Sequence, residues 1–274
     1  MQQWVLPFKQ SSFAVKTWGN GPQLVLCLHG YGESAMHFSF LQQLGSKYTI
    51  AAIDLPYHGD TIWQDKKKLL PVQLLELIGQ LLQNLRKRDT ALYDKLILLG
   101  YSMGGRVALS LYQHQPSLFS KLVLLAPDGL KLNRWYWLAT QTFLGNRLFK
   151  FTMQHPGWFF NMLQLLNKAG MVNTSIFKFV NFYIGDATVR SLLYQRWTVL
   201  SPFRPNLQKL QTMIRQQQTP VRLVYGQYDK IIVPVVGERF IKHIPEQGQM
   251  IILATGHQLL QEKWLADFGK VMAG

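Results

Sequence analysis

Six short runs of apolar residues recur along the chain of 274 residues. Each run is apolar almost without interruption, which is typical of a strand that is covered on both faces. The runs are LVLCLHG (24–30), TIAAIDLP (49–56), KLILLGYS (95–102), KLVLLAP (121–127), PVRLVYG (220–226) and MIILATG (250–256). The hydrophobic pattern therefore predicts a buried sheet.

Stretches with helical spacing of apolar residues separate these runs. Two of them are PVQLLELIGQLLQNLRKR (71–88), in which Pro71 suits a first helical turn, and MGGRVALSLYQHQ (103–115). Alternation of strands and helices predicts an α/β fold with a mostly parallel sheet and helices on both of its faces.

Residues 129–200 interrupt this alternation. They contain no strand-like run, and they hold 15 aromatic residues, 8 lysines or arginines and one acidic residue, Asp186. We expect a helical cap at 129–200, inserted into a core domain of residues 1–128 and 201–274. Loops after parallel strands are where such folds build their sites.

Composition narrows the class of protein. With 48% hydrophobic and 16% charged residues the chain is globular, and no apolar run reaches the length of a membrane span. The single cysteine, Cys27, lies in a strand-like run and is expected to be a buried apolar residue. The start of the chain lacks the pattern of a signal peptide, so we expect a cytoplasmic protein.

The net charge of +15 raises the question of acidic partners. The only basic runs, at 66–68 and 86–88, belong to no recognisable nucleic-acid module. We therefore expect a solvated basic surface and no nucleic-acid partner.

The strand-like run at 95–102 ends in Gly100-Tyr101-Ser102-Met103-Gly104, directly before a helical pattern. A serine in a G-x-S-x-G turn between a strand and a helix has a strained backbone, and its hydroxyl is exposed at the edge of the sheet. The N–H of Met103 lies at a helix N-terminus, where it favours negative charge. Ser102 is thus a candidate nucleophile.

A serine hydroxyl needs a base to accept its proton. His257 follows the last strand-like run, and Asp229 follows the run at 220–226, so both are expected at the same edge of the sheet as Ser102. An aspartate there can accept a hydrogen bond from the imidazole and orient it. Asp128, after the run at 121–127, is an alternative acid.

The other six histidines have weaker claims to be the base. His29 and His58 precede glycines and are expected to hold turns through hydrogen bonds. Surface or packing positions are expected for the remaining four: His37, His114, His155 and His243. No group of histidines and acids has the spacing of metal ligands, so we expect no metal site and no cofactor.

A second donor to a developing oxyanion is expected in the loop His29-Gly30-Tyr31-Gly32. Its glycines allow the N–H of Tyr31 to face Ser102. Together with the N–H of Met103 this would form an oxyanion hole.

In these pieces the chain resembles the α/β-hydrolase superfamily. The matching segments are WGNGPQLVLCLHGYG (18–32), IDLPYHGDT (53–61), GYSMGG (100–105), GQYDKIIVP (226–234) and ATGHQ (254–258). The resemblance implies the nucleophile Ser102, the acid Asp229, the base His257 and oxyanion N–H groups of Tyr31 and Met103. A serine in the elbow differs from the dehalogenase and epoxide hydrolase branches, which use aspartate there.

The reaction expected from this resemblance is ester hydrolysis through an acyl-enzyme, most simply by a carboxylesterase acting on a small or medium acyl ester. Arg106 resembles an arginine that holds an anionic substrate in the pyruvate-eliminating enzyme of the menaquinone pathway, so a C–C lyase or hydrolase is an alternative. A non-catalytic ligand receptor on this fold is a third.

The aromatic residues of the cap allow more than one interpretation. They can pack the cap against the core, or line an apolar acyl pocket over Ser102. Their mixture with basic residues also suggests weak association with anionic lipid. The oligomeric state is left open.

Overall fold

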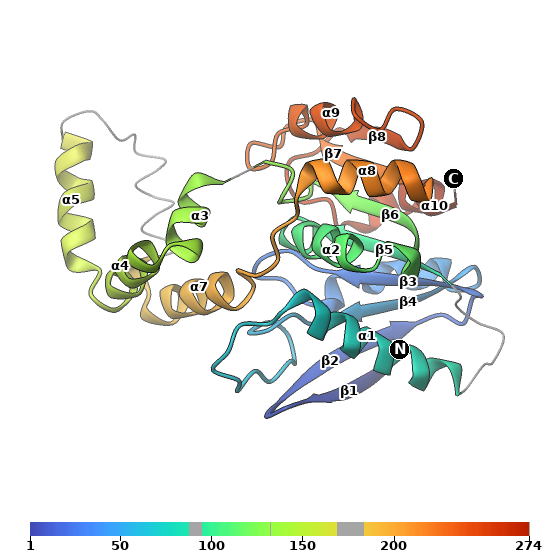
Figure 1. Ribbon diagram of the computed structural model, residues 1–274, viewed down its shortest axis with the longest axis horizontal. Coiled ribbons are helices and arrows are strands. Elements are labelled where there is room, and N and C mark those ends of the chain that lie inside the picture. The colour runs from blue at the N-terminus through green and yellow to red at the C-terminus, as the bar shows by residue number, and fades with distance from the viewer. Residues whose placement is uncertain (88–94, 132, 169–183, 274) are drawn as a thin grey trace. The chain divides into compact units, whose positions relative to one another are not determined.

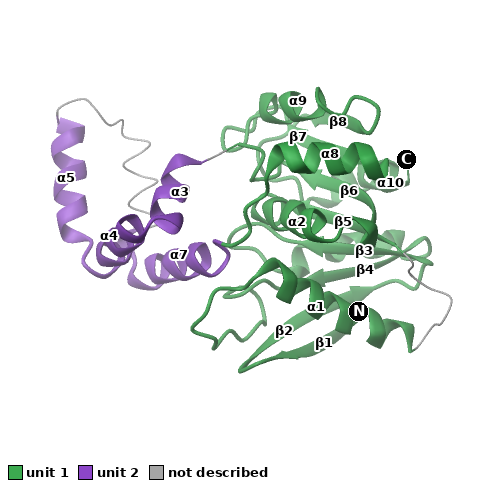
Figure 2. Cartoon of the chain, viewed as in Figure 1, with its two compact units in different colours: residues 1–131, 202–274 green, residues 132–201 purple. Residues whose placement is uncertain are grey.

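The computed structural model of the protein describes residues 1–87, 95–131, 133–168 and 184–273 (Figure 1). The chain divides into two compact units, one of residues 1–131 and 202–274 and one of residues 132–201 (Figure 2). We call them the sheet unit and the helical unit. The helical unit occupies almost the range expected for the cap, of which residues 132 and 169–183 lie outside the described residues.

The sheet unit contains a sheet of eight described strands in the order β1-β2-β4-β3-β5-β6-β7-β8. All neighbours from β4 to β8 pair in parallel. These six strands are β3 (Gln23–Leu28), β4 (Tyr48–Ile53), β5 (Leu96–Tyr101), β6 (Phe119–Leu125), β7 (Val221–Gly226) and β8 (Gly248–Leu253). They coincide with the six apolar runs, which confirms the mostly parallel sheet.

The sequence pattern missed an N-terminal hairpin of β1 (Gln2–Phe8) and β2 (Ser11–Trp18). These strands pair antiparallel, and β2 also pairs antiparallel with β4. In the edge strand β1 the more buried residues alternate with exposed ones, because one face of this strand meets solvent. A search for continuous apolar runs does not detect such a strand.

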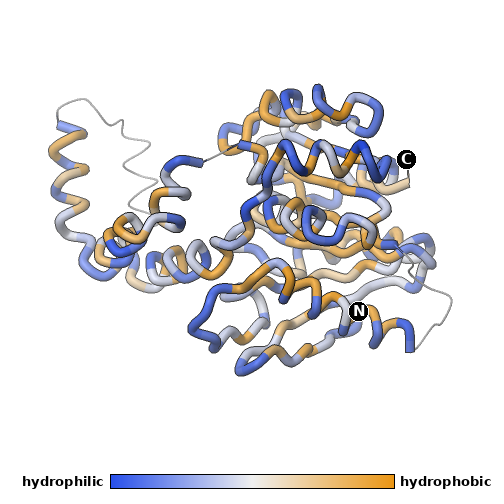
Figure 3. The backbone as a smooth tube through the Cα atoms, in the orientation of Figure 1, coloured by the Kyte–Doolittle hydropathy of each residue, from blue (hydrophilic) through white to orange (hydrophobic). Residues whose placement is uncertain are grey.

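Helices cover both faces of the sheet. α1 (Pro71–Arg86), α2 (Met103–His114) and α8 (Leu207–Gln217) lie side by side over one face, and α10 (Leu265–Ala273) lies on the other, packed against the 3₁₀ helix η1 (Ala35–Leu44) (Figure 1). The shorter elements are η2 (Pro116–Leu118), α9 (Val235–Ile241) and η3 (Glu262–Trp264). Apolar residues concentrate along the covered strands (Figure 3).

The helical unit contains α3 (Arg134–Gln141), α4 (Phe143–Gln154), α5 (Gly157–Lys168) and α7 (Ala187–Val199). Side chains cap three of these helices: Asn133 accepts from the Tyr136 N–H, Thr142 from the Gly145 N–H, and Asp186 from two N–H groups of α7. Across the described ranges, every helix is too short or too polar to traverse a lipid bilayer.

Candidate active site

Ser102 occupies the junction between β5 and α2 with φ +49° and ψ −116°. A non-glycine residue in such a conformation costs on the order of 1–3 kcal/mol, so the surroundings must hold it. Its N–H donates to the carbonyl of Leu125 at 2.9 Å, and its carbonyl accepts from the N–H groups of Gly105 and Asp128, each at 2.9 Å. The elbow is therefore anchored to β6 and to its following loop.

The glycines of the elbow are required by close backbone approach. A Cβ on Gly104 would lie 2.0 Å from the carbonyl oxygen of Leu28, and a Cβ on Gly100 would lie 2.6 Å from the carbonyl oxygen of Gly104. Both distances are far inside van der Waals contact. The start of α2 thus packs directly on the end of β3, where the loop that carries Tyr31 begins.

Three side chains form a continuous hydrogen-bonded chain. Nε2 of His257 lies 3.0 Å from Oγ of Ser102, and Nδ1 of His257 lies 2.7 Å from Oδ2 of Asp229. Asp229 is buried, with 4% of its surface exposed. With Nδ1–H donating to the carboxylate, Nε2 is left to accept the hydroxyl proton of Ser102.

The alternative acid faces another partner. Oδ2 of Asp128 lies 3.5 Å from Nε of Arg106, and its Oδ1 accepts the N–H of Gly129 at 2.8 Å. The structure therefore brings Asp229, rather than Asp128, to His257. It also places Arg106 in a buried position against a carboxylate.

Two further contacts orient the triad. Oδ1 of Asp229 accepts the N–H groups of Ile231 at 2.8 Å and Ile232 at 2.9 Å, which directs Oδ2 toward the imidazole. The hydroxyl of Tyr101 donates to the carbonyl of His257 at 3.0 Å, and the two rings lie 5.4 Å apart. Burial and the charges of Glu33 and Asp229 raise the pKa of Tyr101, so its hydroxyl stays protonated and remains a donor.

The loop after β3 is held by His29, which is fully buried. The N–H of Leu55 donates to its Nε2 at 3.0 Å, so Nδ1 carries the proton and donates to the carbonyl of Gly30 at 2.8 Å. His58 donates in a similar way to the carbonyl of Pro56, at 2.9 Å. Both histidines hold turns, as their position before glycine predicted.

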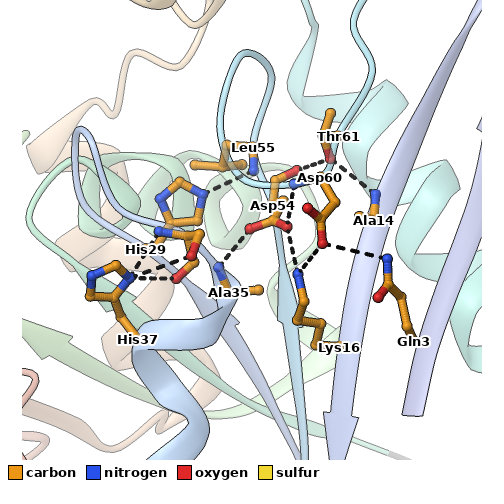
Figure 4. Close-up of polar contacts among 11 residues, drawn as sticks. Gln3, Ala14, Lys16, His29, Ala35, His37, Asp54, Leu55, Asp60 and Thr61 are labelled. Atoms are coloured by element: carbon orange, nitrogen blue, oxygen red, sulfur yellow. Dashed lines mark hydrogen bonds and ion pairs between the residues drawn. The ribbon is translucent and has the colours of Figure 1, made fainter. Parts of the chain in front are cut away.

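A buried charge network lies behind the same loop (Figure 4). Oδ1 of the fully buried Asp54 accepts the N–H of Ala35 at 2.6 Å, and Oδ2 lies 3.2 Å from Nζ of Lys16. Lys16 also contacts Asp60 at 2.7 Å. Burial lowers the pKa of Lys16, but the hydrogen bonds and charges of Asp60 and Asp54 outweigh it and raise the pKa overall.

Sequence reasoning assigned no role to Tyr101 or Lys16, and it noted Asp54 only within a motif. The available signal was the lysine next to the apolar residues Phe13, Ala14 and Val15, because a charge that is buried with them requires a partner. The partner itself, 38 residues away, cannot be deduced from the pattern.

The candidate oxyanion donors lie on the two segments that meet where Gly104 packs against Leu28. Met103 is the first residue of α2, where a helix leaves its N–H groups without intrahelical partners, and Tyr31 lies in the loop after β3.

Cys27 is fully buried in β3 and burial raises the pKa of its thiol, which confirms that it is a packing residue.

Comparison with known proteins agrees with this architecture. The family model described as alpha/beta hydrolase fold matches residues 23–263, and the chain therefore belongs to the alpha/beta hydrolase family. Relatives include the "Uncharacterized hydrolase YugF" of Bacillus subtilis, 25% identical over 91% of both chains. The pimeloyl-[acyl-carrier protein] methyl ester esterase of Nitrosomonas europaea is 24% identical over 90% of this chain and 93% of its own.

Solved structures show the same fold. A carboxylesterase structure from the thaumarchaeon Nitrososphaera gargenis has a TM-score of 0.64 at 15% identity, covering 98% of this chain and 96% of that one. 2-Hydroxy-6-oxo-6-phenylhexa-2,4-dienoate hydrolase from a Rhodococcus species has a TM-score of 0.63 at 17% identity, covering 99% and 97%. The protein is thus a hydrolase of this fold with esterase relatives.

Proposed function

We propose that the protein is a serine carboxylesterase that cleaves small or medium acyl esters through an acyl-enzyme. The observation that carries the proposal is the hydrogen-bonded chain from Ser102 through His257 to Asp229, with distances of 3.0 and 2.7 Å. Esterases among the relatives, including the methyl ester esterase of Nitrosomonas europaea, support an ester as the substrate.

Acylation begins when Oγ of Ser102 attacks the ester carbonyl carbon. Nε2 of His257 accepts the hydroxyl proton, and the resulting imidazolium is stabilised by Asp229 through the bond at Nδ1. The carbonyl oxygen becomes an oxyanion, which the N–H groups of Tyr31 and Met103 stabilise. His257 then donates its proton to the departing alcohol, leaving an acyl ester on Ser102.

Deacylation repeats these steps with water. His257 accepts a proton from water as the water oxygen attacks the acyl carbon, and the oxyanion forms again in the same place. Return of the proton to Oγ of Ser102 releases the acid. Neither half-reaction requires a group beyond the side chains and N–H groups already named.

The helical unit supports an apolar acyl group as part of the substrate. Its helices α3, α4 and α5 contain no acidic residue, and they carry exposed apolar side chains such as Trp135, Phe143 and Leu144. We propose that this unit acts as the cap that selects the acyl group, and that its basic and aromatic surface associates weakly with anionic lipid.

An anionic substrate held by Arg106 is less well supported. The guanidinium is buried and already faces the carboxylate of Asp128, so its charge is balanced within the protein. A receptor that binds without catalysis has no need of an imidazole between a serine and a buried carboxylate. The ester hydrolase is therefore the function that the geometry favours.

The test is turnover of p-nitrophenyl esters of increasing acyl length by the wild type and by Ser102→Ala. We expect kcat to fall by up to about a million-fold in Ser102→Ala, because the nucleophile is removed. A fluorophosphonate probe should label the wild type and not the variant. Ser117→Ala, an exposed serine next to α2, is the matched control and should keep full activity.

Equal turnover by purified Ser102→Ala would refute the serine nucleophile. Labelling of Ser102 without turnover of any ester in the series would instead favour the C–C lyase or hydrolase.

A further inference from the structure

The base of the proposed triad stands on an irregular segment of the chain. Residues 254–261, which include His257, form neither helix nor strand between β8 and η3. Side chains carried by loops are placed less precisely than those carried by strands or helices. The distance of 3.0 Å from Nε2 of His257 to Oγ of Ser102 therefore requires that other elements hold this segment.

One side of the segment is held at the end of β7. The N–H of Tyr228 donates to the carbonyl of Thr255 at 2.9 Å. A Cβ on Gly226 would lie 2.1 Å from the carbonyl oxygen of Gly256, so the backbone of the segment packs directly on β7. These contacts fix the segment as far as the residue before the catalytic base.

The other side is held by Tyr101, which is the last residue of β5 and directly precedes Ser102. Its hydroxyl donates to the carbonyl of His257 at 3.0 Å, and the hydroxyl oxygen lies 3.4 Å from Oε1 of Gln258. A tyrosine hydroxyl has a single proton, and the shorter contact receives it. The backbone of the catalytic base is thus bonded to the residue that precedes the nucleophile.

The ring of Tyr101 is buried, with 2% of its surface exposed, and it packs on two sides. Its centroid lies 5.4 Å from that of the His257 ring. A Cβ on Gly30 would lie 2.9 Å from Cε1 of Tyr101, so the ring also packs on the backbone of Gly30. The strand that carries it, β5, lies inside the sheet and pairs with β3 and β6 (Figure 1). The hydroxyl is therefore a fixed donor.

From these contacts we propose that Tyr101 is a positioning residue of the active site. Its hydroxyl holds the backbone of His257 and so keeps Nε2 within hydrogen-bonding distance of Ser102 in both half-reactions. Because the side chain is buried, it acts through His257 and not on the substrate. The inference rests on the proposed function, because it assigns Tyr101 to the same triad.

A second buried tyrosine separates this role from a purely structural one. Tyr112 of α2 is fully buried, and its hydroxyl donates to Oγ1 of Thr219 at 2.8 Å. Thr219 precedes β7, whereas Asp229 follows the other end of that strand. Replacement by phenylalanine removes one buried hydrogen bond from either tyrosine, but only the bond of Tyr101 is made to the catalytic base.

The experiment compares Tyr101→Phe and Tyr112→Phe with the wild type on p-nitrophenyl acetate. We expect kcat to fall by about 10- to 100-fold in Tyr101→Phe, since a displacement of about 1 Å costs on the order of 100-fold. KM should stay within about twofold, because His257 serves acylation and deacylation and both slow together. Tyr112→Phe should keep the wild-type kcat, while the melting temperature of both variants falls by a few degrees.

Two further measurements test the hydroxyl itself. The rate at which a fluorophosphonate labels Ser102 should fall in Tyr101→Phe by the same factor as kcat, because labelling also needs the base aligned with the nucleophile. A p-aminophenylalanine at position 101 keeps the ring and returns an N–H donor. It should restore most of the kcat that Tyr101→Phe loses.

Wild-type kcat in folded Tyr101→Phe would overturn the inference, and so would an equal loss of kcat in Tyr112→Phe. A loss that p-aminophenylalanine does not reverse would show that the hydroxyl is not the holding group. A wild type that neither hydrolyses esters nor reacts with the fluorophosphonate would refute the proposed function, whereas an active wild type with an equally active Tyr101→Phe would refute the role of Tyr101 alone.

Discussion

The two units differ in how far their large apolar side chains are buried. In the sheet unit the parallel strands β3, β4, β5, β6 and β7 are buried almost completely, whereas the edge strand β8 is partly exposed. The triad residues project from the ends of β5, β7 and β8. In the helical unit α3, α4 and α5 carry ten of the twenty-one exposed large hydrophobic side chains of the described residues. Single exposed apolar residues are normal on a protein surface whereas grouped ones are unusual, and the proposed association with lipid rests on this grouping.

The two units also differ in how their polar side chains are bonded. Around the site the buried polar side chains are tied into networks, such as that of Lys16, Asp54 and Asp60. Among the described residues of the helical unit the polar contacts are mostly helix caps and local bonds, such as that from Thr152 to the carbonyl of Leu148. The catalytic groups are thus held by fixed polar partners, whereas the helical unit exposes apolar side chains.

The largest effect is expected from the acid of the triad. Asp229→Asn should lower kcat by about 10,000-fold, because an amide can stabilise the wrong tautomer of His257. Asp128→Asn is the matched control: its carboxylate also follows a strand but faces Arg106, so activity should change far less. Hydrolysis rates of purified, folded variants decide the matter, and a larger loss in Asp128→Asn would contradict the assignment.

An intermediate effect is expected at the nucleophile turn. Gly104→Ala should destabilise the protein by about 3 kcal/mol, because its Cβ would overlap the backbone of Leu28. Gly79→Ala, in the interior of α1 with no atom within 4 Å of the added Cβ, should instead stabilise by about 0.5–1 kcal/mol. Urea unfolding measures both changes. Similar stabilities of the two variants would show that the elbow does not pack as described.

The smallest effect on catalysis is expected in the helical unit. The double variant Trp135→Ser/Phe143→Ser should bind vesicles of anionic phospholipid more weakly, while kcat/KM on p-nitrophenyl acetate changes by less than about twofold. Val5→Ser/Ile252→Ser removes two exposed apolar side chains from the sheet unit and serves as the control. Cosedimentation is the measurement. Equal binding of wild type and helical variant, or equal binding to zwitterionic vesicles, would refute the lipid surface.

Much of the sheet could be predicted because its signal is local. The six continuous apolar runs became the six parallel strands, and the glycines around Ser102 marked the turn at the end of β5. The hairpin of β1 and β2 escaped because an edge strand that is open on one face alternates, and Lys16 within β2 suggests a surface strand until its buried partner Asp54 is known.

By itself the sequence determined the six parallel strands, the elbow and the identity of the reactive side chains, because these depend on residues that are neighbours along the chain. Only the tertiary structure decided which groups meet: Ser102 and His257 are 155 positions apart, and His257 and Asp229 are 28 apart. The same holds for Tyr101 and His257, which are 156 positions apart. Hydrogen bonds are made over about 3 Å, and distances that short between remote residues depend on strand order and loop packing, which no local pattern contains.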